Sequence, residues 1–302
     1  MVVSSAVVLI CTHNPDPLKL YKVLDSIRKN PGSFRVVLVD NASDNSAARD
    51  FQIEFDYNYV YESRLGNSYA RFAALKEVRQ NELAIFVDDD NFIGLDYIEK
   101  ALHLFSQHPD WGCFGGKQII DPRLRVPIGM KIFLPYVGIR DLGPRVLEMS
   151  ATKYWDTLEP IGAGMCISPE VVRYFLEKLS TNEELFFSLG RKGSGLLSGE
   201  DSFIARQAAF IGLKWGYSPE LVLEHSIKQD RLTFGYLSVL LTSYGRSDVI
   251  LNNALNVDPR HPYPNSIFMV IIQIIYSLRK SLFGIILGFR FLGQFLEFSK
   301  SK

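Results

Sequence analysis

Residues 84–91 have the sequence AIFVDDDN, and the organisation of the whole chain follows from this stretch. Four apolar residues predict a buried strand, and three carboxylates in a row end it. Adjacent carboxylates repel one another, so we expect a positive partner there, most simply a divalent metal ion. Mg²⁺ and Mn²⁺ prefer carboxylate oxygens, and substrate phosphates and water complete their coordination. The stretch therefore predicts a metal and diphosphate site at a strand end; the alternative is a solvated acidic turn.

Composition excludes several classes of protein. The 302 residues are 47% hydrophobic and 22% charged, which indicates a folded chain of one large domain or two modest ones. Lys+Arg and Asp+Glu both number 33, so no net charge favours nucleic acid. Cys11, Cys113 and Cys166 are odd in number and widely spaced, so we expect buried thiols in a reducing compartment. The N-terminus lacks a basic region, so we expect no signal peptide.

Strand and helix patterns alternate along the first part of the chain, at 6–11, 18–28, 34–39, 60–62, 66–78 and 84–87. This alternation predicts βαβ units and a largely parallel sheet, that is, an α/β fold. Ligands of such sheets bind beyond the carboxyl ends of the strands. We therefore expect one crevice to collect the polar residues that follow three strands, namely Thr12, His13, Asn14, Asp40, Asn41, Asp88, Asp89 and Asp90.

The second half of the chain contains several further signals. A helix is predicted over 96–106, and the Pro- and Gly-containing residues 122–154 predict long loops or short antiparallel pieces. Residues 161–167 predict a strand of small residues that a ligand or another backbone can approach closely. Ser168 followed by proline predicts a helix start. A short last strand is expected at 221–224.

Glu200 and Asp201 follow a Gly-rich segment at 189–195 and precede a helix that begins near Phe203. The helix dipole favours carboxylates at this position, so simple capping is the alternative to a chemical role. His225 follows the last predicted strand, and a structural role is again the alternative to a functional one.

The order of these motifs resembles the GT-A glycosyltransferases of family 2, which are inverting enzymes that use sugar nucleotides. The resemblance covers about residues 5 to 250 and rests on CTHN (11–14), VDNASD (39–44), GNSYAR (66–71), FVDDDN (86–91) and GED (199–201) followed by His225. It implies the GT-A fold, with a mostly parallel central sheet flanked by helices and a C-terminal helical extension. The implied catalytic domain is 1–235, with a nucleotide-binding half (1–115) and an acceptor half (116–235), followed by a helical region over 236–302.

The resemblance also implies a donor site. Asp40 would bind the N–H edge of uracil, guanine or thymine, and Arg64 or Arg71 would face the base or the diphosphate. Asp88 would lie toward the ribose and sugar, and Asp90 would bind Mg²⁺ or Mn²⁺ on the diphosphate. The full implied nucleotide and donor set is Thr12, His13, Asn14, Asp40, Asn41, Arg64, Asn67, Arg71, Asp88 and Asp89.

The same resemblance assigns catalysis to Asp201, the implied base, with Glu200 as its partner. Inversion requires a carboxylate to take the proton of the acceptor hydroxyl while that oxygen attacks the anomeric carbon. His225 resembles a downstream histidine that some members use near the metal or the diphosphate. Arg231 and Gly164 are expected contacts of the diphosphate or acceptor, and the alternative for Arg231 is a surface arginine.

Two apolar segments at 267–278 and 281–298 form the tail, and each is shorter than the ~20 residues of a spanning helix. We expect two short helices at the membrane interface; the alternative is a pair packed on the catalytic domain or on a second subunit. The basic residues expected at anionic head groups are Arg279, Lys280, Arg290, Lys300 and Lys302.

Together these features imply an inverting transferase that moves a sugar from a UDP-, GDP- or dTDP-sugar to a saccharide or lipid-linked acceptor in cell-surface polysaccharide synthesis. We expect it in the cytoplasm, peripheral on the inner face of the cell membrane, with Mg²⁺ or Mn²⁺ as cofactor and no nucleic acid partner; a homo-oligomer is left open. The alternatives are a catalytically silent sugar-nucleotide or glycan-binding module, and a nucleotidyltransferase. The latter needs a Gly-rich basic loop after the first strand, which residues 12–17 do not provide.

Overall fold

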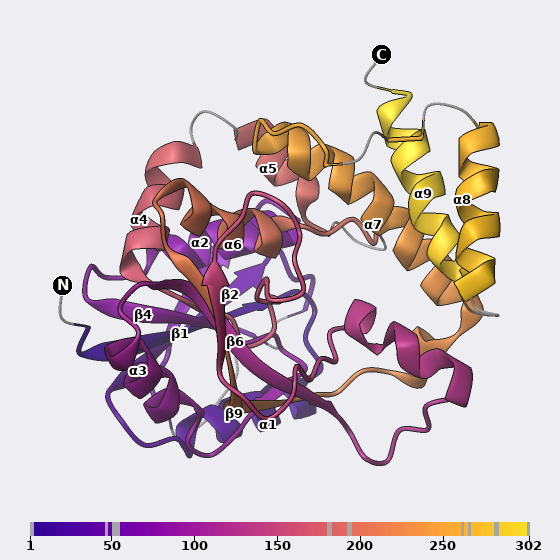
Figure 1. The fold of residues 1–302 in the computed structure, drawn as a ribbon. Helices are drawn as coiled ribbons and strands as arrows, with labels where there is room; N and C mark the ends of the chain where they lie inside the picture. The colour runs from indigo at the N-terminus through magenta and orange to yellow at the C-terminus, as the bar shows by residue number, and fades with distance from the viewer. Residues whose placement is uncertain are drawn as a thin grey trace.

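A mixed sheet runs through the molecule with helices on both of its faces (Figure 1). The computed structural model describes residues 3–45, 48–49, 55–179, 183–191, 195–260, 263–264, 267–280 and 284–300. Within these residues nine strands form one sheet, in the order β3-β2-β1-β4-β8-β6-β9-β5, and β7 pairs with β9. The predicted α/β architecture with a central, mostly parallel sheet is therefore confirmed.

The parallel part of the sheet is its N-terminal half together with one later pair. Its strands are β1 (Ser5–Thr12), β2 (Phe34–Asn41), β3 (Asn58–Glu62), β4 (Glu82–Phe86), β6 (Trp111–Ile120) and β9 (Lys214–His225). Antiparallel pairing joins these strands to β5 (Asn91–Ile93), β7 (Leu147–Ser150) and β8 (Cys166–Ile167). The apolar runs explain this arrangement, because strands buried on both faces are continuously hydrophobic.

The strand register brings the predicted polar clusters to one edge of the sheet. Thr12 at the end of β1 lies opposite Asp40 at the end of β2. Leu9 of β1 lies opposite Phe86, the last residue of β4, so the acidic triplet follows at the same edge. Parallel neighbours necessarily end together, which is why motifs far apart in the sequence converge.

Helices cover the two faces in separate layers, each with its own core. One face carries α1 (Pro17–Arg28) and α3 (Tyr97–Gln107). The other carries α2 (Asn67–Lys76), α4 (Pro169–Lys178), α5 (Glu183–Leu189) and α6 (Glu200–Phe210). Ser168 accepts a hydrogen bond from the amide of Val171, so the predicted cap of α4 is confirmed.

Two sequence predictions differ from the structure in extent, and a third agrees with it. Of the strand predicted over 161–167 only β8 forms, because Gly164 has a φ of +76° and leaves the extended conformation. The short strand predicted at 221–224 is part of the twelve-residue β9, which continues through a register shift against β6. Residues 122–154 contain a 3₁₀ segment, η1 (Ile128–Val137), and the antiparallel β7, in agreement with the prediction of short pieces.

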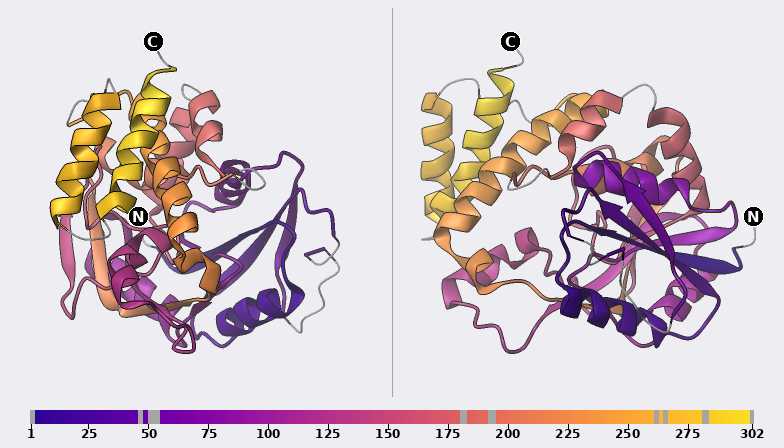
Figure 2. Two further views of the ribbon diagram at one scale, coloured as in Figure 1. Left: turned by 90° about the vertical axis from the view of Figure 1, so that its right-hand side faces the viewer. Right: turned by 180° about the vertical axis from the view of Figure 1, so that it is seen from behind.

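Three helices form the C-terminal region: α7 (Phe234–Ala254), which follows a short 3₁₀ turn η3 (Gln229–Leu232), and the two helices of the tail, α8 (Ile267–Lys280) and α9 (Gly284–Phe298). Figure 2 shows them together on one side of the molecule. α9 packs against both α7 and α8. Among the described residues no helix combines the length and apolarity that crossing a bilayer requires. The domain boundary at residue 235 stays a prediction.

The expectation that Arg290 meets anionic head groups is wrong. Arg290 on α9 donates from Nε and Nη2 to the two carboxylate oxygens of Asp248 on α7, at 2.7 and 2.8 Å. This bidentate pair joins the two helices, because a planar guanidinium matches a carboxylate in two bonds. Lys300 pairs with Glu297 at 3.2 Å. Lys302 and residues 281–283 lie outside the described residues.

The contact of α7 with α9 is so close that glycine is needed on each helix. A Cβ added at Gly245 would overlap the backbone of Arg290, and one added at Gly293 would overlap the carbonyl oxygen of Thr242. The two helix backbones therefore touch directly. This leaves no room for a methyl group between them.

Replacement of Gly293 by Ala should consequently separate α9 from α7. We expect the free energy of unfolding to fall by about 1–3 kcal/mol, the usual cost of overpacking, although alanine favours helix. Urea denaturation followed by circular dichroism measures this change. Gly235→Ala on α7 is the control, because nothing lies within 4 Å of its added Cβ, and it should not destabilise the chain. Equal stability of the two variants would contradict the close contact.

Candidate active site

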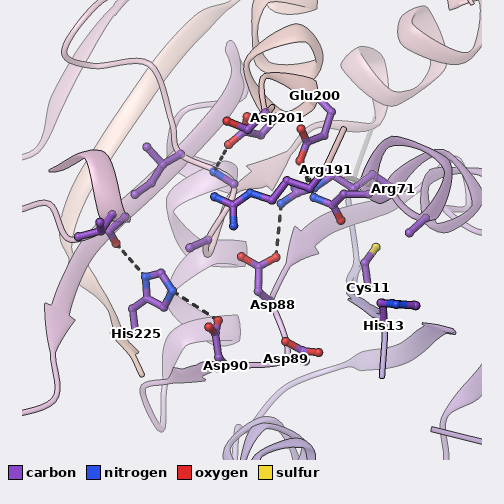
Figure 3. Close-up of a pocket in the computed structure, with 18 of the residues that line it drawn as sticks. Cys11, His13, Arg71, Asp88, Asp89, Asp90, Arg191, Glu200, Asp201 and His225 are labelled. Carbon is purple, nitrogen blue, oxygen red and sulfur yellow. Dashed lines mark hydrogen bonds and ion pairs between the residues drawn. The ribbon is translucent and has the colours of Figure 1, made fainter. Parts of the chain in front are cut away.

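A cavity of about 410 Å³ lies at the edge of the sheet where β1 and β4 end (Figure 3). Its walls come from the ends of β1, β2 and β4, from the starts of α2 and α6, from η1, and from α7. The predicted site residues that line it are Thr12, His13, Asn41, Asn67, Arg71, Asp88, Asp89, Asp90, Glu200, Asp201, His225 and Arg231. Asn14, Asp40, Arg64 and Gly164 do not line it.

Arg71 joins the acidic triplet to the Glu-Asp pair. Its Nη2 lies 3.4 Å from Asp88 Oδ1 and its Nε lies 3.5 Å from Glu200 Oε1. The guanidinium packs 4.5 Å above the ring centre of Phe86, and the residue is 3% exposed. Burial opposes the charge of Arg71, but the surrounding carboxylates outweigh it and raise the pKa of Arg71. Arg71 is therefore a permanent cation in the floor of the cavity.

Glu200 and Asp201 begin α6 and have different environments. Glu200 is 3% exposed and accepts a hydrogen bond from the side-chain amide of Asn67. Burial, followed by the charge of Asp201, raises the pKa of Glu200, and Arg71 acts in the opposite direction. Asp201 is only partly buried, and its Oδ2 accepts a hydrogen bond from the amide of Gly162 at 3.0 Å. Glu200 is thus a buried partner of Arg71, and Asp201 is the carboxylate that faces the cavity (Figure 3).

The second and third carboxylates of the acidic triplet, Asp89 and Asp90, contact different neighbours. Thr12 donates a hydrogen bond from its hydroxyl to Asp89, and burial raises the pKa of Asp89 to about 6. Asp90 Oδ1 lies 3.4 Å from His225 Nε2, and Asp90 Oδ2 lies 3.9 Å from Arg231 Nη1. Burial acts to raise the pKa of Asp90, but the hydrogen bond and charge of His225 and the charge of Arg231 lower it overall. Asp90 therefore stays ionised beside two basic groups.

His225 is held from its other ring nitrogen. Its Nδ1 lies 3.3 Å from the carbonyl oxygen of Gly138, and its Nε2 faces Asp90. Gly138 has a φ of +76°, and a Cβ there would lie 3.0 Å from the imidazole. Glycine is needed at this position for the 3₁₀ segment to reach the histidine.

One side of the cavity is built by the loops after β1 and β2. His13 Nδ1 donates to the carbonyl oxygen of Asn41 at 2.8 Å. Asn41 Nδ2 donates to the carbonyl oxygen of Arg64 at 2.7 Å, and its Oδ1 accepts from the amide of Gly66 at 2.8 Å. Asn14 Oδ1 accepts from the amide of Asp44 at 2.8 Å, which joins the two loops.

The four predicted residues that do not line the cavity have other contacts. Asp40 is buried, and its carboxylate accepts hydrogen bonds from the hydroxyl of Tyr59 at 2.8 Å and the amide of Ser43 at 3.2 Å. Burial and Asp40 raise the pKa of Tyr59 to about 12. Arg64 pairs with Glu62, and the carbonyl oxygen of Gly164 accepts from the hydroxyl of Tyr97.

The oxygen donors of the cavity suit a hard divalent cation. Asp88 has 36% of its side chain exposed and Asp90 lies beside His225, so two carboxylates and an imidazole border the same open space. Mg²⁺ and Mn²⁺ need only one or two carboxylates when phosphates complete the shell. Asp88, Asp90 and His225 thus offer the ligand types that such an ion takes, but in this structure their ligand atoms do not all lie within 4.8 Å of one another.

Among the described residues, the group whose ligand atoms do lie that close together is elsewhere. His108, Asp110 and Glu148 have ligand atoms within 4.8 Å of one another, near the start of β6 and outside the cavity. Lys214 Nζ lies 2.8 Å from Asp110 and 2.7 Å from Glu148. A lysine thus already supplies the positive charge there.

Sequence reasoning did not select Arg191 and Tyr244 as site residues, yet both line the cavity. Tyr236, Leu240 and Tyr244 are spaced at four residues on α7, so they share one helix face. This spacing, on the helix that follows the strand ending in His225, is the sequence feature that indicates Tyr244 as a site residue. Cys11 also lines the cavity, and burial raises the pKa of its thiol to about 12, which makes it a poor nucleophile.

A protein-family model matches most of the chain. Residues 5–250 match the family model described as "Glycosyltransferase like family 2". A solved structure titled "Crystal structure of S. aureus TarS" is similar with a TM-score of 0.48 and 16% identity, over 84% of this chain and 43% of that one. Lysozyme g-like protein 1 of Homo sapiens is 30% identical over 98 residues, which are 31% of this chain and 50% of that protein. The matched part of this chain covers 50% of the human protein and 43% of the solved structure. Neither likeness indicates an activity.

Replacement of Arg71 by Met leaves Glu200 and Asp88 without their cation. We expect a loss of about 3–5 kcal/mol in the free energy of unfolding at pH 7, because a buried charge becomes unpaired. Burial already raises the pKa of Glu200 in the folded state, and loss of Arg71 raises it further. The folded variant therefore binds a proton more readily than the unfolded chain, so its deficit should shrink as the pH falls toward the ordinary pKa of a glutamate.

Urea denaturation at pH 7 and pH 5 tests both parts of this prediction. Arg64→Met is the control, because the pair of Arg64 with Glu62 is half exposed and contributes at most about 1 kcal/mol. The same loss in both variants, or a deficit at Arg71 that does not change with pH, would contradict the buried pair.

Proposed function

The chain belongs to the glycosyltransferase-like family 2, and from this we propose that it transfers a sugar, with inversion, from a nucleotide-diphosphate donor to a hydroxyl of a saccharide or lipid-linked acceptor. One observation carries the proposal. The carboxylates that follow β4 and the carboxylate of Asp201 face the same cavity from opposite sides, with Arg71 between them. An inverting transfer in one displacement step requires a group that binds the donor on one side of the space and a base for the acceptor hydroxyl on the other.

In this proposal the nucleotide lies over the ends of β1 and β2. His13 and Asn41 offer polar atoms at the cavity wall there, and Asn67 and Arg71 extend that wall from α2. Contact of Asp40 with the base stays a prediction. In the structure its carboxylate already accepts hydrogen bonds from Tyr59 and Ser43, so such contact needs these bonds to rearrange.

Asp201 is the proposed base. It would accept the proton of the acceptor hydroxyl as that oxygen bonds to the anomeric carbon and the bond to the diphosphate breaks. The amide of Gly162 holds one carboxylate oxygen, and the other accepts from the amide of Ser202 at 2.8 Å, so the group is oriented before substrate binds. Glu200 keeps Arg71 in place behind it.

Asp88, Asp90 and His225 are the residues we propose to hold Mg²⁺ or Mn²⁺. When bound, such an ion supplies positive charge to the departing diphosphate. Arg231, 3.9 Å from Asp90, lies near enough to reach the same phosphates. The identities of the donor sugar and of the nucleobase depend on loops whose geometry the sequence motifs do not specify.

The change Asp201→Asn should spare donor binding and stop transfer. We expect kcat for transfer or donor hydrolysis to fall at least about 100-fold, because a positioned base contributes about 10²–10⁴-fold. Thermal stabilisation by a panel of nucleoside diphosphates and sugar nucleotides, with Mn²⁺ or with chelator, identifies the donor, since a ligand of the native state raises the midpoint. Asp90→Ala should lose the metal-dependent shift.

The exposed carboxylate of Asp96 provides the matched control, and Asp96→Asn should change neither readout. Full activity in Asp201→Asn, or loss of donor binding there with binding kept in Asp90→Ala, would overturn the assignment. Donor binding without any turnover in the wild type would indicate a silent binding module instead.

The tail supports a proposal about location. The exposed side chains of α8 recur at helical spacing on one face, at Ile267, Phe268, Ile271, Ile272 and Ile275. Residues 267–278 contain no charge, and Arg279 and Lys280 follow. We propose that this face lies in the interface of an anionic membrane, so that the protein acts on the inner face of the cell membrane in surface polysaccharide assembly.

Ile272→Glu should weaken binding to phosphatidylglycerol vesicles severalfold, because it places a charge in the buried face of the helix. Co-sedimentation measures the bound fraction. Leu18→Glu on α1 is the control, because Leu18 is an exposed leucine far from the tail in sequence, and it should bind like the wild type. Unchanged vesicle binding, or a change in oligomeric state by light scattering instead, would indicate that a second copy covers the face.

A further inference from the structure

The guanidinium of Arg191 stands out among the cations of the cavity. Figure 3 shows Arg191 beside Arg71, between Asp88 and the pair formed by Glu200 and Asp201. Within the part of the chain that the structure describes, no hydrogen bond or ion pair occupies its side chain. A charged group in a cavity that lacks a protein partner is expected to have a ligand.

The backbone of Arg191 is fixed, so its side chain enters the cavity from a defined point. The amide of Asn67, the first residue of α2, donates to the carbonyl oxygen of Arg191 at 3.0 Å. Gly190 packs so closely on Ser68 that an added Cβ would overlap the serine. These contacts dock the segment after α5 on the start of α2 and hold Arg191 at the cavity wall.

The other two arginines of the cavity each lie within 4 Å of a carboxylate. Arg71 lies 3.4 Å from Asp88 and 3.5 Å from Glu200, and Arg231 lies 3.9 Å from Asp90. The cavity lining holds five carboxylates, Asp88, Asp89, Asp90, Glu200 and Asp201. A phosphate in this space is repelled by these groups, so it needs a cation that is not already paired with them.

Arg191 stays charged in this setting. Burial opposes its charge, but Tyr244, Tyr236, Glu200 and Asp88 raise the pKa of Arg191 overall. Its planar donors suit phosphate oxygens in two simultaneous hydrogen bonds. The position between Asp88 on the donor side and Asp201 on the base side is where the bond to the leaving group must break.

We propose that Arg191 binds the diphosphate of the nucleotide donor and compensates the charge that the leaving group gains; this rests on the proposed transferase function. The acceptor oxygen forms the new bond to the anomeric carbon, and its proton passes to Asp201. The bond from that carbon to the diphosphate oxygen breaks, and its electron pair stays on the diphosphate beside Arg191.

The test uses the full-length protein and the nucleoside diphosphate that stabilises the wild type in the presence of Mn²⁺. Isothermal titration should show affinity reduced roughly 10- to 100-fold in Arg191→Gln, the size expected for lost charged hydrogen bonds. Arg191→Lys should bind with intermediate affinity, and the corresponding nucleoside monophosphate should lose less. Arg123→Gln, a matched change at an exposed arginine paired with Asp121, should bind like the wild type.

A thermal midpoint equal to that of the wild type, measured without ligand, establishes that a variant folds. If Arg191→Gln does not fold, the diphosphate affinity of Arg191→Lys is the test. Unchanged diphosphate affinity in a folded Arg191→Gln would overturn the inference alone. If that variant instead raises only the KM for the acceptor, the phosphate is the acceptor's and the inference is again wrong. A wild type that binds no nucleotide would overturn the proposed function itself.

Discussion

The buried cation of Arg71 is the interaction on which the rest of the site depends. It lies on α2 and faces Asp88 after β4 and Glu200 at the start of α6. Without it, Asp88 and the buried Glu200 would come together from two elements with no Arg71 between them, and their mutual repulsion would separate them. With it, the acidic triplet and the Glu-Asp pair share one cavity. The same contact leaves Asp201 free to face the cavity.

The convergence at the sheet edge follows from the sequence because it needs only strand order. Apolar runs that end in Thr12, Asp40 and Asp88 predict parallel strands, and parallel strands end together. Strand and helix types were predicted correctly for the same reason, since each has its own hydrophobic period. The fold prediction therefore rested on local patterns that the tertiary structure did not override.

The finer structure of the site depends on loop geometry, which the sequence pattern does not contain. The burial of Asp40 under Tyr59 and the reach of Gly138 to His225 require backbone angles that no period encodes. Arg191 was overlooked because its neighbours in sequence are glycines and charges typical of a surface loop. Arg290 was misjudged because its partner, Asp248, lies on another helix. In both cases the determining contact is between residues far apart in the chain.

The docking of the segment around Arg191 on the start of α2 also bears on how the protein is made. On the ribosome β1, β2 and β4 emerge long before residues 189–201, so the first amide of α2 then lacks Arg191, and Arg71 has Asp88 but not yet Glu200. The early half of the nascent chain can therefore form its sheet but not a finished site. The cavity is complete only when the later half, which supplies Glu200 and Asp201, has been synthesised.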